Sequence, residues 1–219
     1  KLTPGIFIAY LALTRRWRAA ATAAGSAAAA TLLAAAVAPD ATREFWFSAL
    51  PNTDRVGVLA FISNQSLRGM VARLGQPELG DLLWPATVLL ALLLWGWRLW
   101  RRTEVTAGLA LTGIVGALVS PVTWIHHLVW LLPALVLLVD HALAAPAASR
   151  RRRRLLAAAV VGYLLACSGI VWLWELNSSG VLAFLGGNMY VWLSLALLLW
   201  LPVPPRDAAG ERDAVVPAD

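Results

Sequence analysis

Long apolar segments alternate with clusters of arginine along this chain of 219 residues. Ala19–Ala38 is a run of twenty residues without a charged side chain. At about 1.5 Å per residue, a helix of this length covers the roughly 30 Å of a bilayer's hydrocarbon core. The pattern predicts an all-α integral membrane protein. Its six predicted spans and one partial span are Pro4–Leu13 (partial), Ala19–Ala38, Leu82–Trp97, Val105–Val119, Val122–Ala145, Leu155–Trp174 and Met189–Leu201.

The arginine clusters predict how the chain is oriented. An even number of predicted spans separates each cluster from the next, so all three lie on one side. The positive-inside rule makes that side the cytoplasm. We expect one helical domain over residues 1–201, followed by a disordered cytoplasmic tail over residues 202–219. The clusters are Arg15, Arg16 and Arg18; Arg98, Arg101 and Arg102; and the run Arg150–Arg154.

Composition narrows the functional classes. A chain that is 60% hydrophobic and 14% charged has too little polar surface for a soluble domain. The net charge of +6 would suit nucleic-acid binding. Most of the basic residues, however, lie in the three arginine clusters, where a topology signal explains them. We therefore expect membrane lipids, and no nucleic acid, as partners.

Small residues predict where helices pack closely. The alanine-rich segment Ala19–Ala38 is expected to lie inside the helical bundle, because small side chains let helix backbones approach. Gly108, Thr112 and Gly116 recur every four residues and are expected to form a packing seam on one helix face.

The only long polar segment, residues 39–81, is predicted to be an external loop. A loop of this length in a compact protein is usually functional. It contains the polar stretch Ser63–Gly69 and two cations, Arg68 and Arg73, that are candidates to meet a phosphate. Alternatively, Arg68 and Arg73 are ordinary solvated charges of the loop.

A second polar stretch, Ser120–His127, lies between two predicted spans on the same outer side. Ionisable groups at this depth are costly and rare, so the adjacent His126 and His127 are candidates to hold a phosphate or a proton. Simple solvation at the membrane interface is the alternative. Neighbouring residues on a helix point about 100° apart, which makes this pair poor metal ligands, and we expect no metal.

Several segments resemble one known family. Lys1–Pro4, Thr14–Arg18, Asn64–Leu67 with Arg73, and Ser120–Trp130 are similar to the C-terminal half of the actinobacterial polyprenol-phosphate-mannose-dependent α-1,2-mannosyltransferases, glycosyltransferase family 87. The resemblance covers most of residues 1–201.

The resemblance implies a helical bundle of the GT-C type that needs no cofactor. It implies transfer of mannose from polyprenol phosphate mannose to a mannosylated glycolipid or glycan, at the extracytoplasmic face of the plasma membrane. The family's catalytic base is an Asp in the first external loop, so the base is expected upstream of Lys1, and these residues alone are expected to be inactive. The donor pocket would contain His126 or His127, Asn64, Gln65, Ser66 and Arg68, and also Lys1 if the preceding helix brings it to the outer face.

Two other functions stay open. A transporter or flippase for lipid-linked sugars would favour charges at the membrane midplane and paired broken helices, and the sequence indicates neither. In a non-catalytic membrane scaffold the polar stretches would be accidental. Alanine at His126 and His127 separates the classes, because a scaffold should tolerate the change.

Overall fold

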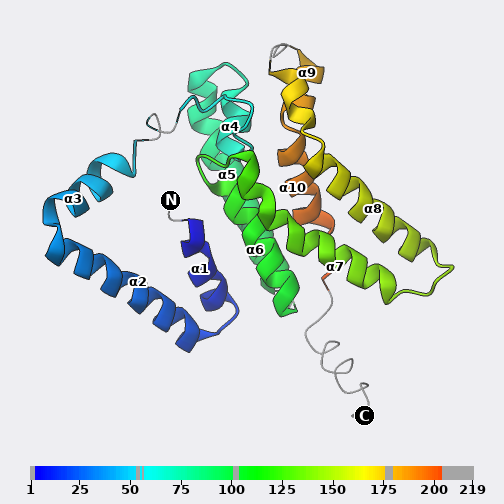
Figure 1. Cartoon of the computed structure of the whole chain (residues 1–219), viewed down its shortest axis with the longest axis horizontal. Coiled ribbons are helices and arrows are strands. Elements are labelled where there is room, and N and C mark those ends of the chain that lie inside the picture. The colour runs from blue at the N-terminus through cyan, green and yellow to red at the C-terminus, as the bar shows by residue number, and fades with distance from the viewer. Residues whose placement is uncertain (1–2, 53–54, 56, 101–103, 176–179, 204–219) are drawn as a thin grey trace.

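The computed structural model describes residues 3–52, 55, 57–100, 104–175 and 180–203. Lys1 and nearly all of the predicted tail, residues 204–219, lie outside this part. Within it the chain folds into helices joined by turns and loops (Figure 1). The α-helices are α1 (Ile6–Leu13), α2 (Trp17–Val37), α3 (Pro39–Glu44), α4 (Leu67–Ala72), α5 (Pro77–Trp100), α6 (Val105–Val119), α7 (Leu132–Leu143), α8 (Arg150–Cys167), α9 (Val181–Gly187) and α10 (Met189–Trp200).

Three helical segments are long and apolar enough to cross a membrane: α2, α5 and Ile125–Leu143, in which a 3₁₀ helix continues into α7. The bent pair α9–α10 makes a fourth if it is one span. α6 has the predicted bounds but only 15 residues, and α8 begins with five arginines. By length and composition, the described part therefore has three or four spans.

α6 lies at the centre of the packing. Nearly all of its residues from Ala107 to Leu118 are buried. A Cβ added at Gly108 would lie 2.8 Å from the ring of Tyr10, and one added at Gly116 would lie 3.2 Å from Ile6. Both neighbours are on α1, so the glycines of the expected seam do let two helices approach closely.

The expectation that Ala19–Ala38 lies inside the bundle is wrong for the described chain. Of the 21 residues of α2, only Ala20 is buried. α2 packs chiefly on α1 and α3 and stands apart from the other helices (Figure 1). Alanine permits close packing but offers little apolar area, so its abundance does not by itself determine a partner.

Residues 175–188, which lie between the predicted spans Leu155–Trp174 and Met189–Leu201, are helical in part. α9 occupies Val181–Gly187 and meets α10 at an angle of 65°. The break falls at Asn188, directly after Gly186 and Gly187. The sequence analysis did not indicate this break, because an apolar pattern alone would continue the helix that two glycines and an asparagine end.

Arg98 has a structural partner that its place in an arginine cluster did not indicate. Its side chain is buried, and the guanidinium donates to the carbonyl oxygen of Leu198 at 3.0 Å and to those of Leu199 and Leu201. These are carbonyls at the C-terminal end of α10, where helical partners run out and a cation is favourable. Arg98 thus fastens the end of α5 to the end of α10.

We expect Arg98→Lys to lower the free energy of unfolding by about 1–2 kcal/mol, because lysine keeps the charge but cannot reach three carbonyls with a planar fork. Urea unfolding in detergent micelles measures this. Arg153→Lys, at an exposed position of α8, is the matched control. Equal losses in the two variants would contradict the role given to Arg98.

Candidate functional site

Three segments that are distant in sequence meet at the end of the bundle that carries α4 and α9 (Figure 1). They are residues 59–73, the turn 120–127 and the α9–α10 break. The two polar stretches that the sequence analysis placed on one side thus lie in direct contact. Asparagine, glutamine and serine side chains make most of the connections.

Asn64 ties the loop to the turn. It forms an isolated antiparallel bridge with Trp124, and its side-chain Oδ1 accepts from the backbone N–H of Thr123 at 2.9 Å. Its Nδ2 donates to the carbonyl oxygens of Leu59 and Pro121, at 2.9 and 3.4 Å. The side chain is fully buried, so each of these bonds replaces contact with water.

Ser66 caps α4. Its Oγ accepts from the backbone N–H of Gly69 at 3.0 Å and donates to the carbonyl of Pro121 at 3.1 Å. The first bond satisfies a free N–H at the helix start, and the second holds that start against the turn.

Gln65 joins the two halves of the broken span. Its Nε2 donates to the carbonyl of Gly187, at the end of α9, at 2.8 Å. Its Oε1 accepts from the N–H of Tyr190, at the start of α10, at 3.2 Å. A third bond, from Nε2 to the carbonyl of Ile62, is 2.7 Å long. One buried amide therefore satisfies backbone groups that each helix leaves free at the break.

The polar side-chain atoms of Asn64, Gln65 and Ser66 are thus engaged within the protein. Their role in the described structure is to fix the loop, the turn and the helix break relative to one another. Direct contact of these three side chains with a substrate stays a prediction.

His126 and His127 follow the bridged turn, on the 3₁₀ helix Ile125–Leu131. Their ring centroids are 4.2 Å apart. The Nδ1 of His127 accepts from the backbone N–H of Trp124 at 2.9 Å, so a neutral His127 carries its proton on Nε2. His126 is exposed and makes no hydrogen bond with the described residues, which leaves both its ring nitrogens available to a ligand.

Arg68 lies on α4 with its guanidinium over the ring of Trp84, 4.6 Å from the ring centroid. This cation–π contact orients the side chain without neutralising its charge. The buried Nε1 of Trp84 has no hydrogen-bond partner among the described residues.

Arg73, the second candidate cation, is turned into the protein. Its guanidinium contacts Asn188 and the carbonyl oxygens of the 59–64 segment. Burial lowers the pKa of Arg73 to about 10, because desolvation disfavours the charged form. Asn188 was missed from the sequence; its position after two glycines inside an apolar stretch is the signal that could have identified it.

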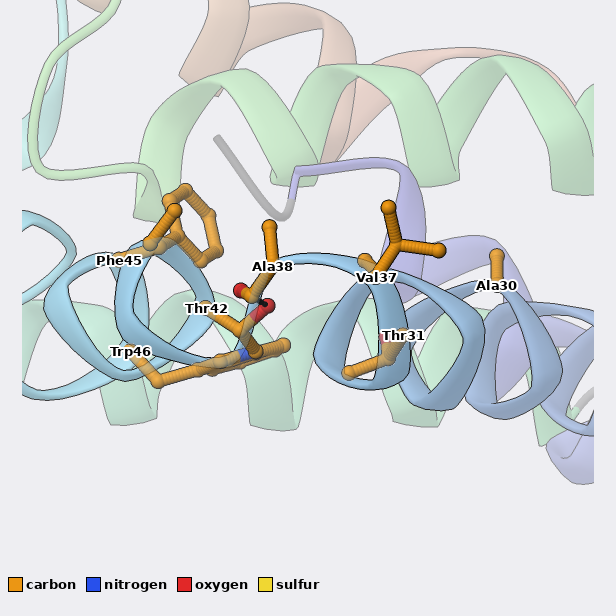
Figure 2. A pocket seen from close by; sticks show the side chains of 9 residues that line it. Ala30, Thr31, Val37, Ala38, Thr42, Phe45 and Trp46 are labelled. Atoms are coloured by element: carbon orange, nitrogen blue, oxygen red, sulfur yellow. Dashed lines mark hydrogen bonds between the residues drawn. The ribbon is translucent and has the colours of Figure 1, made fainter.

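A separate hollow of about 590 Å³ lies at the elbow between α2 and α3 (Figure 2). Its two threonine hydroxyls donate to carbonyls of their own helical turns, so they offer no free donor to a ligand. No ionisable side chain lines it, and none of the predicted site residues does. The lining residues are Ala30, Thr31, Ala34, Val37, Ala38, Ala41, Thr42, Phe45 and Trp46.

Comparison with known proteins gives a consistent assignment. The family model described as glycosyltransferase family 87 matches residues 1–121. A polyprenol-phosphate-mannose-dependent alpha-(1-2)-phosphatidylinositol pentamannoside mannosyltransferase of Mycobacterium tuberculosis is 34% identical over 228 aligned residues, covering 97% of this chain and 49% of that protein. The protein of that name from Mycolicibacterium smegmatis is 31% identical, covering 92% of this chain and 50% of its own length.

A phosphatidylinositol mannoside mannosyltransferase of Mycobacterium tuberculosis, also dependent on polyprenol phosphate mannose, is 37% identical over 145 residues, which are 63% of this chain and 33% of that protein. The chain thus spans between a third and a half of the length of these relatives. No solved structure matches it.

Proposed function

The chain belongs to glycosyltransferase family 87, and we propose that it forms part of a mannosyltransferase that uses polyprenol phosphate mannose. The names of the relatives include this donor. They also include phosphatidylinositol mannosides, which we propose as the acceptor class. We further propose a multi-span bundle of the GT-C type in the plasma membrane. The turn 120–127, which we call the histidine turn, would lie at the extracytoplasmic face, and the C-terminus would lie in the cytoplasm.

In this reaction the acceptor hydroxyl oxygen attacks C1 of mannose, and the bond from C1 to the lipid phosphate breaks. The phosphate leaves with the electron pair and gains negative charge, while the hydroxyl proton passes to a base. Hydrogen-bond donors and cations aimed at the departing phosphate lower the barrier. We assign these tasks to His126 and Arg68, and we assign the base to no described residue.

The observation that carries the proposal is the pairing of one fixed and one free histidine. The bond from Trp124 holds the ring of His127, while His126 beside it is exposed and has free ring nitrogens. Asn64 and Ser66 anchor the turn on which both stand. Such anchoring is what an anion-binding group needs in order to be in place before the ligand arrives.

We expect His126→Ala to weaken binding of polyprenol phosphate mannose to the detergent-solubilised chain about tenfold, the effect of losing one charge-assisted hydrogen bond. The melting temperature should not change, because His126 makes no hydrogen bond within the described protein. Val129→Ala, at an exposed position of the same 3₁₀ helix, is the control. Donor binding that is absent in the wild type, or equal in wild type and His126→Ala, would refute the proposal.

The bent α9–α10 pair is the one described feature that a lipid-linked-sugar transporter would share. Its break, however, is bridged by Gln65 on both sides, as expected for a fixed element rather than a gate. The transferase is therefore the function we propose.

A further inference from the structure

Arg73 joins the 59–73 loop to the break between α9 and α10. Its Nε and Nη2 both donate to Oδ1 of Asn188, at 3.0 and 2.5 Å. Nη2 also donates to the carbonyl of Asn64 at 3.0 Å, and Nη1 donates to the carbonyls of Phe61 and Ala60, at 3.0 and 3.5 Å. All five N–H donors of the guanidinium are therefore in use.

Every acceptor that the described residues offer to Arg73 is neutral. The described residues provide four backbone or amide oxygens and no carboxylate within reach. Carbonyl oxygens satisfy the hydrogen-bonding capacity of the guanidinium, but no carboxylate among the described residues compensates its charge. An unpaired cation in a largely desolvated place is costly, so a protein that retains one gains from an anion nearby.

The junction is connected to the histidine turn through Asn64. The carbonyl of Asn64 accepts from Arg73, and its side chain holds Thr123, three residues before His126. Arg73 therefore fixes the geometry of the turn and contributes positive potential at the same end of the helices. With no N–H to spare, it does not itself contact a ligand.

We propose that Arg73 is a positioning residue of the donor site whose uncompensated charge favours the phosphate of a polyprenyl-phosphate lipid. This inference rests on the proposed function. It assigns phosphate selectivity to the electric field of a residue that orders the loops but does not contact the ligand.

Two substitutions separate charge from geometry. Asn188→Asp keeps the oxygen that accepts from Arg73 and neutralises its charge with a carboxylate, but it loses the bond from Nδ2 to the carbonyl of Phe184 at 2.7 Å. Arg73→Lys preserves the charge but loses most of the hydrogen bonds. The probes are farnesyl phosphate and farnesol in detergent micelles, which differ only in the phosphate.

The wild type is expected to bind farnesyl phosphate more tightly than farnesol. Asn188→Asp should weaken farnesyl phosphate binding about five- to tenfold, a change typical of one nearby charge, with farnesol binding unchanged. Arg73→Lys should lower the melting temperature but retain the preference for the phosphate. Ala147→Asp, in the exposed α7–α8 turn, makes the same change in net charge and should alter neither property.

A wild type that prefers the phosphate, with the preference intact in Asn188→Asp, would overturn the inference and leave the proposed function standing. A wild type without any preference would overturn the proposed function as well. If Asn188→Asp does not fold, Arg73→Lys decides alone, since loss of its phosphate preference would show that geometry and not charge is responsible.

Discussion

Replacing Gln65 with leucine should lower the free energy of unfolding by about 4 kcal/mol. The substitution keeps a side chain of similar size but removes all three hydrogen bonds of a buried amide. It strands the carbonyls of Ile62 and Gly187 and the N–H of Tyr190, and each unpaired buried group costs about 1–3 kcal/mol. Urea unfolding in detergent micelles, followed by tryptophan fluorescence, measures the loss.

The position of Gln65 makes the effect larger than that of an ordinary buried amide. Its Nε2 and Oε1 bond to backbone groups in the last turn of α9 and the first turn of α10. The leucine variant therefore leaves backbone groups on both sides of the break without a partner. Gln76→Leu, at an exposed position before α5, is the control and should change stability by less than about 0.5 kcal/mol. Similar midpoints for the two variants would show that Gln65 does not hold the break.

Much of the fold follows from the sequence because apolar length and periodicity are local properties. The predicted segment Val105–Val119 is α6 with the same bounds, and Ala19–Ala38 is α2 within two residues at each end. Counting spans placed the two polar stretches on one side of the membrane, but their direct contact was not predicted. The glycine seam was predictable because a missing Cβ has only a few uses in a helix.

Apart from α9, which lies between two predicted spans, the failures concern partners rather than elements. Alanine-rich composition did not indicate whether α2 is surrounded, and an arginine in a topology cluster did not indicate that Arg98 binds the end of α10, about a hundred residues away in sequence. The same holds for Asn188, which meets Arg73 across 115 residues. Such pairings depend on tertiary geometry, which local pattern does not encode.

The candidate site shows the same division. The sequence identified Asn64, Gln65 and Ser66 as a polar cluster of interest but gave no means to choose between contact with a ligand and contact with the protein. The answer depends on which groups each side chain meets in the folded protein. There, backbone groups of other segments use the donors and acceptors of all three side chains. In contrast, the ring of His126 makes no hydrogen bond with the described residues.

Gly69→Ala should destabilise the protein by about 3 kcal/mol, the upper range for forcing one methyl group into a packed interior. Gly69 lies in α4, directly over Asn64. A Cβ there would lie 2.8 Å from Cγ and 2.9 Å from Nδ2 of that side chain, and would also overlap its carbonyl oxygen. Glycine is therefore required by close approach of backbone to backbone, and not by its own dihedral angles.

A small movement cannot relieve the clash, because hydrogen bonds hold both the backbone and the side chain of Asn64. Its carbonyl accepts from Arg73, its amide bonds to the turn, and the N–H of Gly69 itself is used by the cap at Ser66. A shift of Asn64 would thus loosen the histidine turn, so farnesyl phosphate binding should weaken together with stability. Gly96→Ala, at a helical position of α5 with no atom within 4 Å of the added Cβ, is the matched control and should stabilise by up to about 1 kcal/mol through helix propensity. If Gly69→Ala were as stable as Gly96→Ala, or unstable without any loss of phosphate binding, the link from this loop to the histidine turn would have to be abandoned.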